Sequence, residues 1–266
     1  MTDAIIPAHI ALDAIVRLAL DAGAAAMDVY NSDFDATLKA DASPVTEADE
    51  RGEAIILAGL AAIAPEIPVL AEEKAAAGDI PEDLGELFFL VDPLDGTKEF
   101  VTRTGEFTVN IALIARGRPV LGVVYAPAIK TMYVGAPDGA WRARVTATGA
   151  LEEKQTILAR PAPRDGLVAV ASRSHRSPET DEFLGTLTVA DFTAAGSSLK
   201  FCLLAEGKAD IYPRFGRTME WDTGAGQAVL EAAGGSVLVH PSGEPLSYGK
   251  KPRGYDNPHF IAWGKR

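Results

Sequence analysis

The sequence predicts a layered α/β fold, and three observations support this prediction. The chain has 266 residues, of which 47% are hydrophobic and 23% charged, so it can bury a large core. Its N-terminal part contains two segments with the helical spacing of apolar residues, and short β-like runs follow them. The second half alternates apolar strands with helical stretches. This order of elements is typical of sheets that are covered by helices.

Two helices are expected before any strand. Larger apolar residues recur at every third or fourth position from Leu12 to Tyr30, which predicts a helix with one apolar face. The segment from Ala48 to Ala64 repeats this pattern, and Pro65 limits its end.

Short β-like runs follow the second helix. They are Pro68–Ala71, Leu87–Val91, Phe107–Ala115, Val120–Tyr125 and Thr131–Val134. Turn signals at residues 116–119 and 137–139 separate the later runs, so a meander is expected there.

The second half is expected to alternate strands with helices. The strands are Leu167–Ala171, Asp210–Tyr212, Ser236–Val239 and Phe260–Trp263, and the helices are Pro178–Leu187, Ser198–Glu206 and Asp222–Ala233. A charged and turn-rich segment at residues 148–165 is the best boundary. It divides the chain into an N-terminal α+β subdomain (1–148) and a C-terminal α/β subdomain (149–266).

Charge and cysteine content exclude several classes of function. The chain has 25 basic and 37 acidic residues, a net charge of −12, and no long Lys/Arg run, so no nucleic-acid polymer is expected as a partner. A small anionic ligand is compatible with this charge where a bound metal or a few local cations reverse the field. The single cysteine, Cys202, excludes an intrachain disulfide and a Cys-rich metal site.

A cytoplasmic location is expected. Asp3 stands where a secretory signal would carry basic residues. The longest apolar stretch, Ala54–Ala64, is much shorter than the ~20 residues that span a bilayer, so no transmembrane segment is expected. Peripheral association with a membrane surface stays open.

Carboxylates are the chemistry-bearing residues that remain. The chain has four widely spaced histidines, which makes a His-rich zinc site improbable. It lacks the Walker A loop and the G-x-G-x-x-G, G-x-S-x-G and H-E-x-x-H motifs.

The densest polar site follows a fully apolar run and contains Asp92 and Asp95, three residues apart. Both carboxylates and the carbonyl of Leu94 can converge on one point, which suits Mg²⁺. A helix that begins at Thr97 after Gly96 would offer backbone N–H groups to a phosphate. An Asp-Gly turn with Asp95 capping this helix explains the spacing equally well.

Three further acidic sites are weak on their own. Glu72 and Glu73 end a short apolar strand, and a solvated pair is the favoured interpretation. Thr46 and Asp49 have the spacing of a capping box at the start of the second helix. Asp222 has the place of a cap for the helix that follows it.

Taken together, these sites resemble a known family. The motifs are Asp41, Ser43-Pro44-Val45-Thr46, Ala48-Asp49, Glu72-Glu73, Asp92-Pro-Leu-Asp-Gly-Thr-Lys-Glu-Phe100, Gly196-Ser-Ser-Leu-Lys-Phe201 and Trp221-Asp222. In this order they resemble the inositol monophosphatase superfamily, over about residues 39–233. The Lys-Glu-Phe ending and the Gly196–Phe201 motif are similar to the CysQ-type 3′(2′),5′-bisphosphate nucleotidases. The resemblance implies a layered α-β-α-β-α sandwich of the inositol monophosphatase type.

The resemblance also implies metal ligands and catalytic residues. The ligands of two or three Mg²⁺ ions would be Glu72, Asp92, the Leu94 carbonyl, Asp95 and Asp222, and Glu73 would act nearby through water. Thr97, oriented by Asp49, would position the water that attacks phosphorus. The N-terminal subdomain would thus carry most metal ligands, and the C-terminal subdomain would complete the substrate pocket.

The implied substrate is a small phosphorylated nucleotide. Its contacts would be Glu72, Leu94, Asp95, Gly96, Thr97, Gly196, Ser197, Ser198, Lys200, Arg214 and Asp222. Helix capping is the alternative for Ser197 or Ser198, and a solvated surface charge is the alternative for Lys200 or Arg214.

The implied reaction is Mg²⁺-dependent hydrolysis of the 3′-phosphate of adenosine 3′,5′-bisphosphate to AMP and phosphate, linked to sulfate assimilation. An inositol-phosphate or fructose-1,6-bisphosphate phosphatase is the alternative, because the metal site is common to the fold and only the pocket differs. A non-catalytic phosphate-binding protein is disfavoured, because the charges of the complete acid set would repel one another without cations. A homodimer is compatible with the resemblance.

Overall fold

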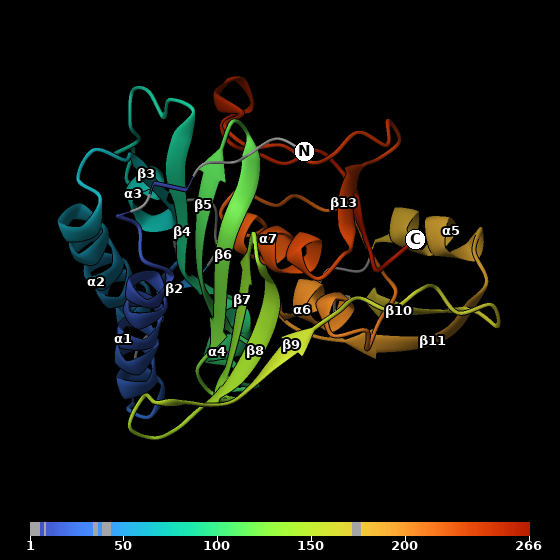
Figure 1. Cartoon of the computed structure of the whole chain (residues 1–266), viewed down its shortest axis with the longest axis horizontal. Helices are drawn as coiled ribbons and strands as arrows, with labels where there is room; N and C mark the ends of the chain where they lie inside the picture. The colour runs from blue at the N-terminus through green and yellow to red at the C-terminus, as the bar shows by residue number, and fades with distance from the viewer. Residues whose placement is uncertain (1–5, 8, 34–36, 39–43, 172–176) are drawn as a thin grey trace.

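The computed structural model describes residues 6–7, 9–33, 37–38, 44–171 and 177–266, and these form five alternating layers (Figure 1). Two helices cover one face of a seven-stranded sheet, and two more helices lie between that sheet and a five-stranded sheet. A further helix lies on the outer face of the five-stranded sheet. The predicted α-β-α-β-α sandwich is confirmed.

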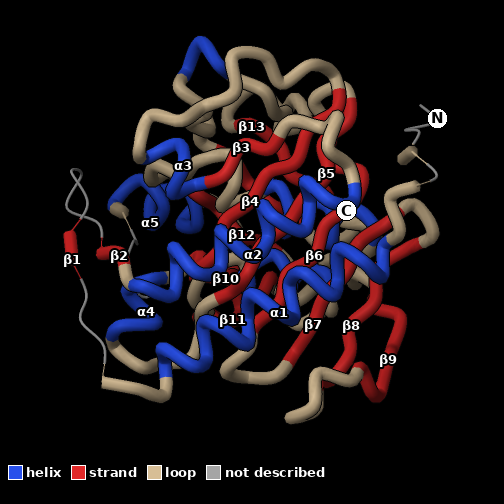
Figure 2. Tube along the Cα trace, turned by 90° about the vertical axis from the view of Figure 1, so that its left-hand side faces the viewer, coloured by secondary structure: helices blue, strands red, loops and turns tan. Residues whose placement is uncertain are grey.

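The first layer consists of α1 (Leu12–Tyr30) and α2 (Glu47–Ile63), which lie side by side across the seven-stranded sheet (Figure 2). The first helix has the predicted bounds, and the second begins and ends one residue earlier than predicted. Their apolar stripes bury Ile15 and Ile56 in one cluster against the sheet. In the part of the chain that the structure describes, no helix is long and apolar enough to cross a membrane.

The seven-stranded sheet has the order β3-β4-β5-β6-β7-β8-β9. Its strands are β3 (Val69–Ala71), β4 (Leu87–Asp95), β5 (Thr108–Ala115), β6 (Arg118–Ala126), β7 (Thr131–Ala136), β8 (Gly139–Val145) and β9 (Leu151–Ile157). Strands β3 and β4 are parallel, and the other neighbours pair antiparallel. The predicted meander is confirmed and is longer than the sequence indicates.

Strands β8 and β9 were not among the predicted strands. All residues of β9 except Ile157 are exposed at the edge of the sheet, so their polar composition hides the apolar pattern of a strand. This strand lies inside the segment 148–165, and it pairs with β8. The interpretation of that segment as turn-rich is wrong for residues 151–157, while the division into subdomains at 148/149 stays a prediction.

The five-stranded sheet has the order β11-β10-β12-β14-β13. Its strands are β10 (Leu167–Ala171), β11 (Val189–Ala194), β12 (Ile211–Arg214), β13 (Ser236–Val239) and β14 (Phe260–Trp263). Helices α6 (Leu199–Ala205) and α7 (Gly224–Ala232) lie on its inner side, and α5 (Pro178–Gly185) lies on its outer side. The short elements are β1 (Thr37–Leu38), β2 (Pro44–Val45), α3 (Glu72–Ala76), α4 (Thr97–Val101) and the 3₁₀ helix η1 (Lys251–Arg253).

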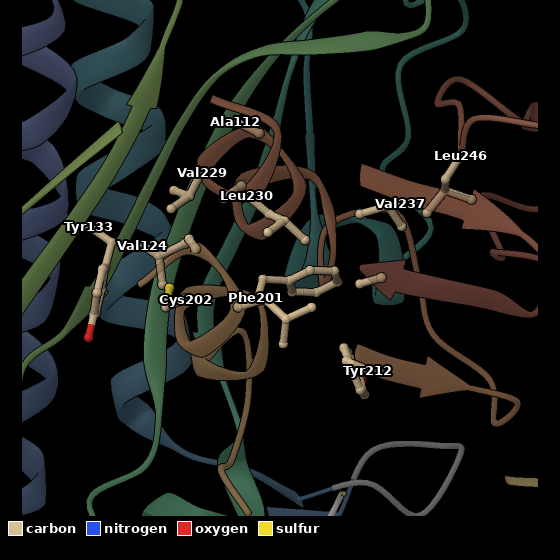
Figure 3. Close-up of a cluster of buried hydrophobic side chains, with 14 of the residues drawn as sticks. Ala112, Val124, Tyr133, Phe201, Cys202, Tyr212, Val229, Leu230, Val237 and Leu246 are labelled. Carbon is tan, nitrogen blue, oxygen red and sulfur yellow. The ribbon is translucent and has the colours of Figure 1, made fainter. Parts of the chain in front are cut away.

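A large hydrophobic cluster fills the space between the two sheets (Figure 3). Phe201 of α6 meets Tyr212 of β12 edge-on, with ring centroids 5.4 Å apart, and Val229 of α7 belongs to the same cluster. Cys202 is 1% exposed within this cluster, so it packs in the core.

Helix α7 lies so close to the seven-stranded sheet that a glycine is needed at the contact. A Cβ on Gly135 of β7 would lie 2.4 Å from the carbonyl oxygen of Ala228. We expect Gly135→Ala to lower the free energy of unfolding by about 1–3 kcal/mol, because backbone must move to admit the methyl group. Chemical denaturation measures this loss. The control is Gly185→Ala, where an added Cβ meets nothing within 4 Å, and equal stabilities of the two variants would contradict the prediction.

Candidate active site

Residues from both halves of the chain line a cavity of 530 Å³. Eight of the predicted site residues line it: Glu72, Asp95, Gly96, Thr97, Ser197, Lys200, Arg214 and Asp222. The others, Asp49, Asp92, Leu94, Gly196 and Ser198, adjoin these in sequence or through hydrogen bonds. The structure thus brings the predicted set together. Asp41 and Ser43 of the motif lie outside the described residues.

A bulge at the end of β4 places two acids at the edge of the cavity. Asp92 pairs with Asn110 and Asp95 with Thr108, so β4 contains one more residue than β5 between these pairs. The strand therefore continues beyond the predicted end at Val91, because a bulge accommodates a proline that would interrupt a regular ladder. Asp92 is 2% exposed, and its Oδ1 accepts a hydrogen bond from the N–H of Leu94 at 3.0 Å.

Gly96 turns the chain from β4 into α4. Its φ of 93° lies in the left-handed region, which favours glycine. Helix α4 begins at Thr97 as predicted, but no side chain caps it. The interpretation of Asp95 as a helix cap is therefore wrong. Its Oδ2 instead lies 3.4 Å from Nδ2 of Asn110.

The carboxylates around this corner are near enough to interact electrostatically, and they repel one another. Burial, followed by the charge of Glu72 and the other acids, raises the pKa of Asp92 well above its usual value. Burial raises the pKa of Asp95 to about 6, although the charge of Lys200 opposes this shift. Burial and the charge of Asp95 raise the pKa of Asp222 to about 8. The charged form of such a cluster is favoured when a cation lies beside it.

The donor chemistry of this cluster fits a hard divalent cation. Carboxylate and carbonyl oxygens are the ligands that Mg²⁺ prefers, and the Leu94 carbonyl adjoins the acids. A side-chain hydrogen bond joins Glu72 to Asp92. Within the described residues, no three His, Cys, Asp or Glu side chains are gathered closely enough to bind a metal ion as they stand. The fit therefore depends on donor types and charge, not on a preformed cage.

Asp49 contacts both the helix that carries it and the hydroxyl of Thr97. Its Oδ2 accepts hydrogen bonds from the N–H and the hydroxyl of Thr46, both at 2.8 Å, so the predicted capping box is confirmed. Its Oδ1 lies 3.4 Å from Oγ1 of Thr97. Asp49 can therefore take part in the capping box of α2 and orient Thr97 at the same time, because the two contacts use different oxygens of its carboxylate.

The helix caps considered for Asp222 and the two serines do not form. Asp222 precedes the N-cap residue of α7, and its Oδ2 accepts from the N–H of Met219 at 2.9 Å. Ser198 occupies the N-cap position of α6, but its hydroxyl donates to the carbonyl of Asp222 at 2.9 Å. The hydroxyl of Ser197 donates to the carbonyl of Glu106 at 3.1 Å. These bonds connect the segments around the cavity.

Four basic side chains line the cavity with the acids, and they are Lys98, Lys200, Arg214 and Arg217. Lys200 is 7% exposed, so its interpretation as a solvated surface charge is wrong, and its Nζ donates to the carbonyl of Ser197 at 2.9 Å. Burial lowers the pKa of this ammonium, while the charge of Asp95 opposes the shift. Arg214 donates through Nη2 to the carbonyl of Arg217 at 3.0 Å. Its buried Nε has no hydrogen-bond partner among the described residues.

Three glutamates hold segments of the site in place and were not expected. Glu106 accepts a hydrogen bond from the N–H of Gly196 at 2.9 Å. Glu220, fully buried, accepts from the N–H groups of residues 249 and 250 at 2.7 and 2.8 Å. Glu53 of α2 binds the start of α3. Of the three, Glu53 has a signal in the sequence, because it falls on the buried stripe of its helix.

Known proteins match this chain over nearly its whole length. The sequence model of the inositol monophosphatase family matches residues 10–260. The 3′(2′),5′-bisphosphate nucleotidase CysQ of Escherichia coli (strain K12) is 47% identical over 253 residues, which cover 94% of this chain and 98% of the relative. The crystal structure of CysQ from Bacteroides thetaiotaomicron matches with a TM-score of 0.78 at 40% identity, covering 96% of this chain and 97% of that one. An inositol monophosphatase from Thermotoga maritima, at 23% identity and a TM-score of 0.75, covers 95% of this chain and 91% of its own and shares the fold. The chain belongs to the inositol monophosphatase family.

Proposed function

We propose that this chain is a Mg²⁺-dependent 3′(2′),5′-bisphosphate nucleotidase that hydrolyses the 3′-phosphate of adenosine 3′,5′-bisphosphate to AMP and phosphate. The observation that carries this proposal is a single cavity lined by both an acidic cluster and four basic side chains, Lys200 and Arg214 among them. The relatives named as nucleotidases, which match nearly the whole chain, support the same activity. A role in sulfate assimilation, a cytoplasmic location and a homodimer remain predictions.

Acidic groups at the carboxyl end of β4 would bind the metal. The proposed ligands of two or three Mg²⁺ ions are Glu72, Asp92, the Leu94 carbonyl, Asp95 and Asp222. Bound Mg²⁺ lowers the pKa of an attacking water and stabilises charge on the leaving oxygen. The raised pKa values of the acids support this assignment, because a bound cation offsets both the burial and the mutual repulsion that raise them.

Asp49 and Thr97 would direct the attacking water. The Thr97 hydroxyl lies 3.4 Å from Asp49 Oδ1 and also 3.4 Å from the carbonyl oxygen of Leu94. With that carbonyl bound to Mg²⁺, the hydroxyl proton would be directed toward the carboxylate of Asp49. The hydroxyl oxygen is then available as an acceptor for an O–H group of the water. Such orientation and proton transfer by positioned side chains is general base catalysis.

The two phosphates would be held by different residues of the cavity. Backbone N–H groups of Gly96 and Thr97 would contact the reacting phosphate, and Lys200 and Arg214 would pair with the 5′-phosphate. Further proposed contacts to the nucleotide are Gly196, Ser197 and Ser198.

The test is phosphate release with Mg²⁺ from adenosine 3′,5′-bisphosphate, inositol 1-phosphate and fructose 1,6-bisphosphate, compared by kcat/KM. We expect preference for the nucleotide, because Lys200 and Arg214 offer a second anion contact that inositol 1-phosphate cannot use. Preference for either other substrate would keep the metal chemistry and overturn the assigned substrate. No release from any of them would overturn the proposed activity.

Replacing Lys200 with Met should weaken use of the bisphosphate selectively. Methionine keeps an apolar stem but removes the ammonium, so the 5′-phosphate loses a charge-assisted hydrogen bond of about 1.5–3 kcal/mol, or roughly 10- to 100-fold in kcat/KM. Adenosine 3′-phosphate, which lacks the 5′-phosphate, should lose much less. The control is Lys208→Met, since this ammonium pairs with Glu206 and does not line the cavity. Equal losses on both substrates would contradict a nucleotide role for Lys200.

A further inference from the structure

Helix α2 presents two carboxylates on its buried stripe. Asp49 and Glu53 are four residues apart, on the same face as Ile56 and Leu60, and are 0% and 5% exposed. A carboxylate on the buried stripe of an amphipathic helix destabilises the folded state unless it is hydrogen-bonded. Asp49 has a proposed role through its contact with Thr97. Glu53, in contrast, is not one of the proposed Mg²⁺ ligands.

Glu53 binds the start of a second helix. Its Oε2 accepts a hydrogen bond from the N–H of Glu73 at 2.8 Å, and its Oε1 accepts from the N–H of Lys74 at 2.9 Å. These residues directly follow Glu72, the first residue of α3. Each carboxylate oxygen therefore holds one N–H group in the first turn of that helix.

Helix α3 needs such a partner. It has five residues, far fewer than the ~12–15 at which isolated helices become marginally stable in water. Its own N-cap residue is Ala71, which provides no side-chain cap. Glu53 supplies the missing acceptors from α2, so the position of Glu72 depends on a residue 19 positions earlier in the chain.

The same face of α2 also touches the turn that carries the other acids. A Cβ on Gly52 would lie 3.3 Å from the Cβ of Pro93, between Asp92 and Leu94. Three positions on one face of α2 thus lie next to three segments of the site: Asp49 lies next to Thr97, Gly52 next to the β4 turn, and Glu53 next to the start of α3.

We propose that Glu53 is a positioning residue, which holds Glu72 in place for Mg²⁺ by capping α3 from the neighbouring helix. This inference rests on the proposed function, because it assigns Glu72 to the metal site. The cap requires two acceptor oxygens at the reach of a glutamate. An amide can accept through one oxygen only, and an aspartate is one methylene shorter.

The experiment measures Mg²⁺ binding to the full chain by calorimetry and the Mg²⁺ dependence of activity. For Glu53→Gln we expect the Kd for Mg²⁺ to rise by about 10- to 100-fold, the range found when partners of metal ligands are removed. The Mg²⁺ concentration for half-maximal activity should rise by the same factor, while kcat at saturating Mg²⁺ changes little. A purely structural role would lower the thermal midpoint and leave the Kd unchanged, which would overturn the proposal.

Glu53→Asp separates position from charge. It keeps the negative charge near the site but shortens the side chain, so we expect it also to weaken Mg²⁺ binding. Wild-type Mg²⁺ affinity in Glu53→Asp would mean that charge alone matters, and this would overturn the positioning role. The variant also keeps the inference testable if Glu53→Gln fails to fold.

Asp210→Asn is the matched control for loss of a buried carboxylate. Asp210 is 2% exposed, accepts from the N–H of Val168 at 2.7 Å, pairs with Arg160, and does not line the cavity. We expect it to lower stability with unchanged Mg²⁺ affinity, and an equal loss of Mg²⁺ affinity in both variants would overturn the proposal. A wild-type chain that neither binds Mg²⁺ nor releases phosphate would overturn the proposed function instead.

Discussion

Replacing Asp95 with Asn should reduce kcat by at least about 10³-fold, because metal ligation stabilises transition-state charge by several kcal/mol. The side chain keeps its size, and its place at the end of β4 lets the amide oxygen still face Nδ2 of Asn110. The fold should therefore stay intact by circular dichroism. The control is Asp138→Asn in the exposed turn between β7 and β8, which should leave kcat unchanged.

The same variant should be at least as stable as the wild type when Mg²⁺ is removed by a chelator. Burial raises the folded pKa of Asp95 from 3.8 to about 6, so ionisation costs the folded chain more than the unfolded chain. In the wild type, the contribution of this group to the free energy of unfolding is fully present below its unfolded pKa of 3.8. It is lost as the pH rises through its folded pKa of about 6. Asparagine does not ionise, so the thermal midpoint of Asp95→Asn at about pH 8 should equal or exceed that of the wild type.

The measured kcat of the same variant tests the catalytic role. Near-normal turnover of Asp95→Asn would remove Asp95 from the mechanism.

Helices and strands could be predicted from the sequence where the spacing of their apolar residues matches the face that they bury. Helix α1 keeps both predicted bounds, because its apolar spacing is the spacing of its buried face. Strands β10, β13 and β14 also keep their predicted bounds. Strand β9 could not be predicted in this way, since it is exposed at the sheet edge and is held by pairing with β8.

The acids of the site could be predicted as a group, but the residues that position them could not. Asp92 and Asp95 follow an apolar run in the sequence, and in the structure both lie in the last part of strand β4. Glu106 binds Gly196 across 90 positions of sequence, a contact that no local pattern encodes. Glu53 is different, because its place on the buried stripe of α2 is visible in the helical spacing once charged residues are included.

Replacing Thr97 with Val should lower kcat by about 10²- to 10⁴-fold, the range of a lost acid–base group, with little loss of stability. Valine has nearly the same shape as threonine but lacks the hydroxyl that faces Asp49. Thr97→Ser keeps this hydroxyl and should retain most of the activity. Wild-type kcat in Thr97→Val, measured at saturating Mg²⁺ and substrate, would contradict the proposed role.

Asp49→Asn should lower both kcat and stability, because Asp49 also accepts two hydrogen bonds from Thr46 in the capping box of α2. If Thr97 acts through Asp49, the double variant Asp49→Asn, Thr97→Val should have about the same kcat as the slower single variant, since groups that act as a unit are not additive. Its stability loss should match that of Asp49→Asn alone. Losses of kcat that multiply would mean that the two residues act separately, and the contact between Oγ1 and Oδ1 would then be structural.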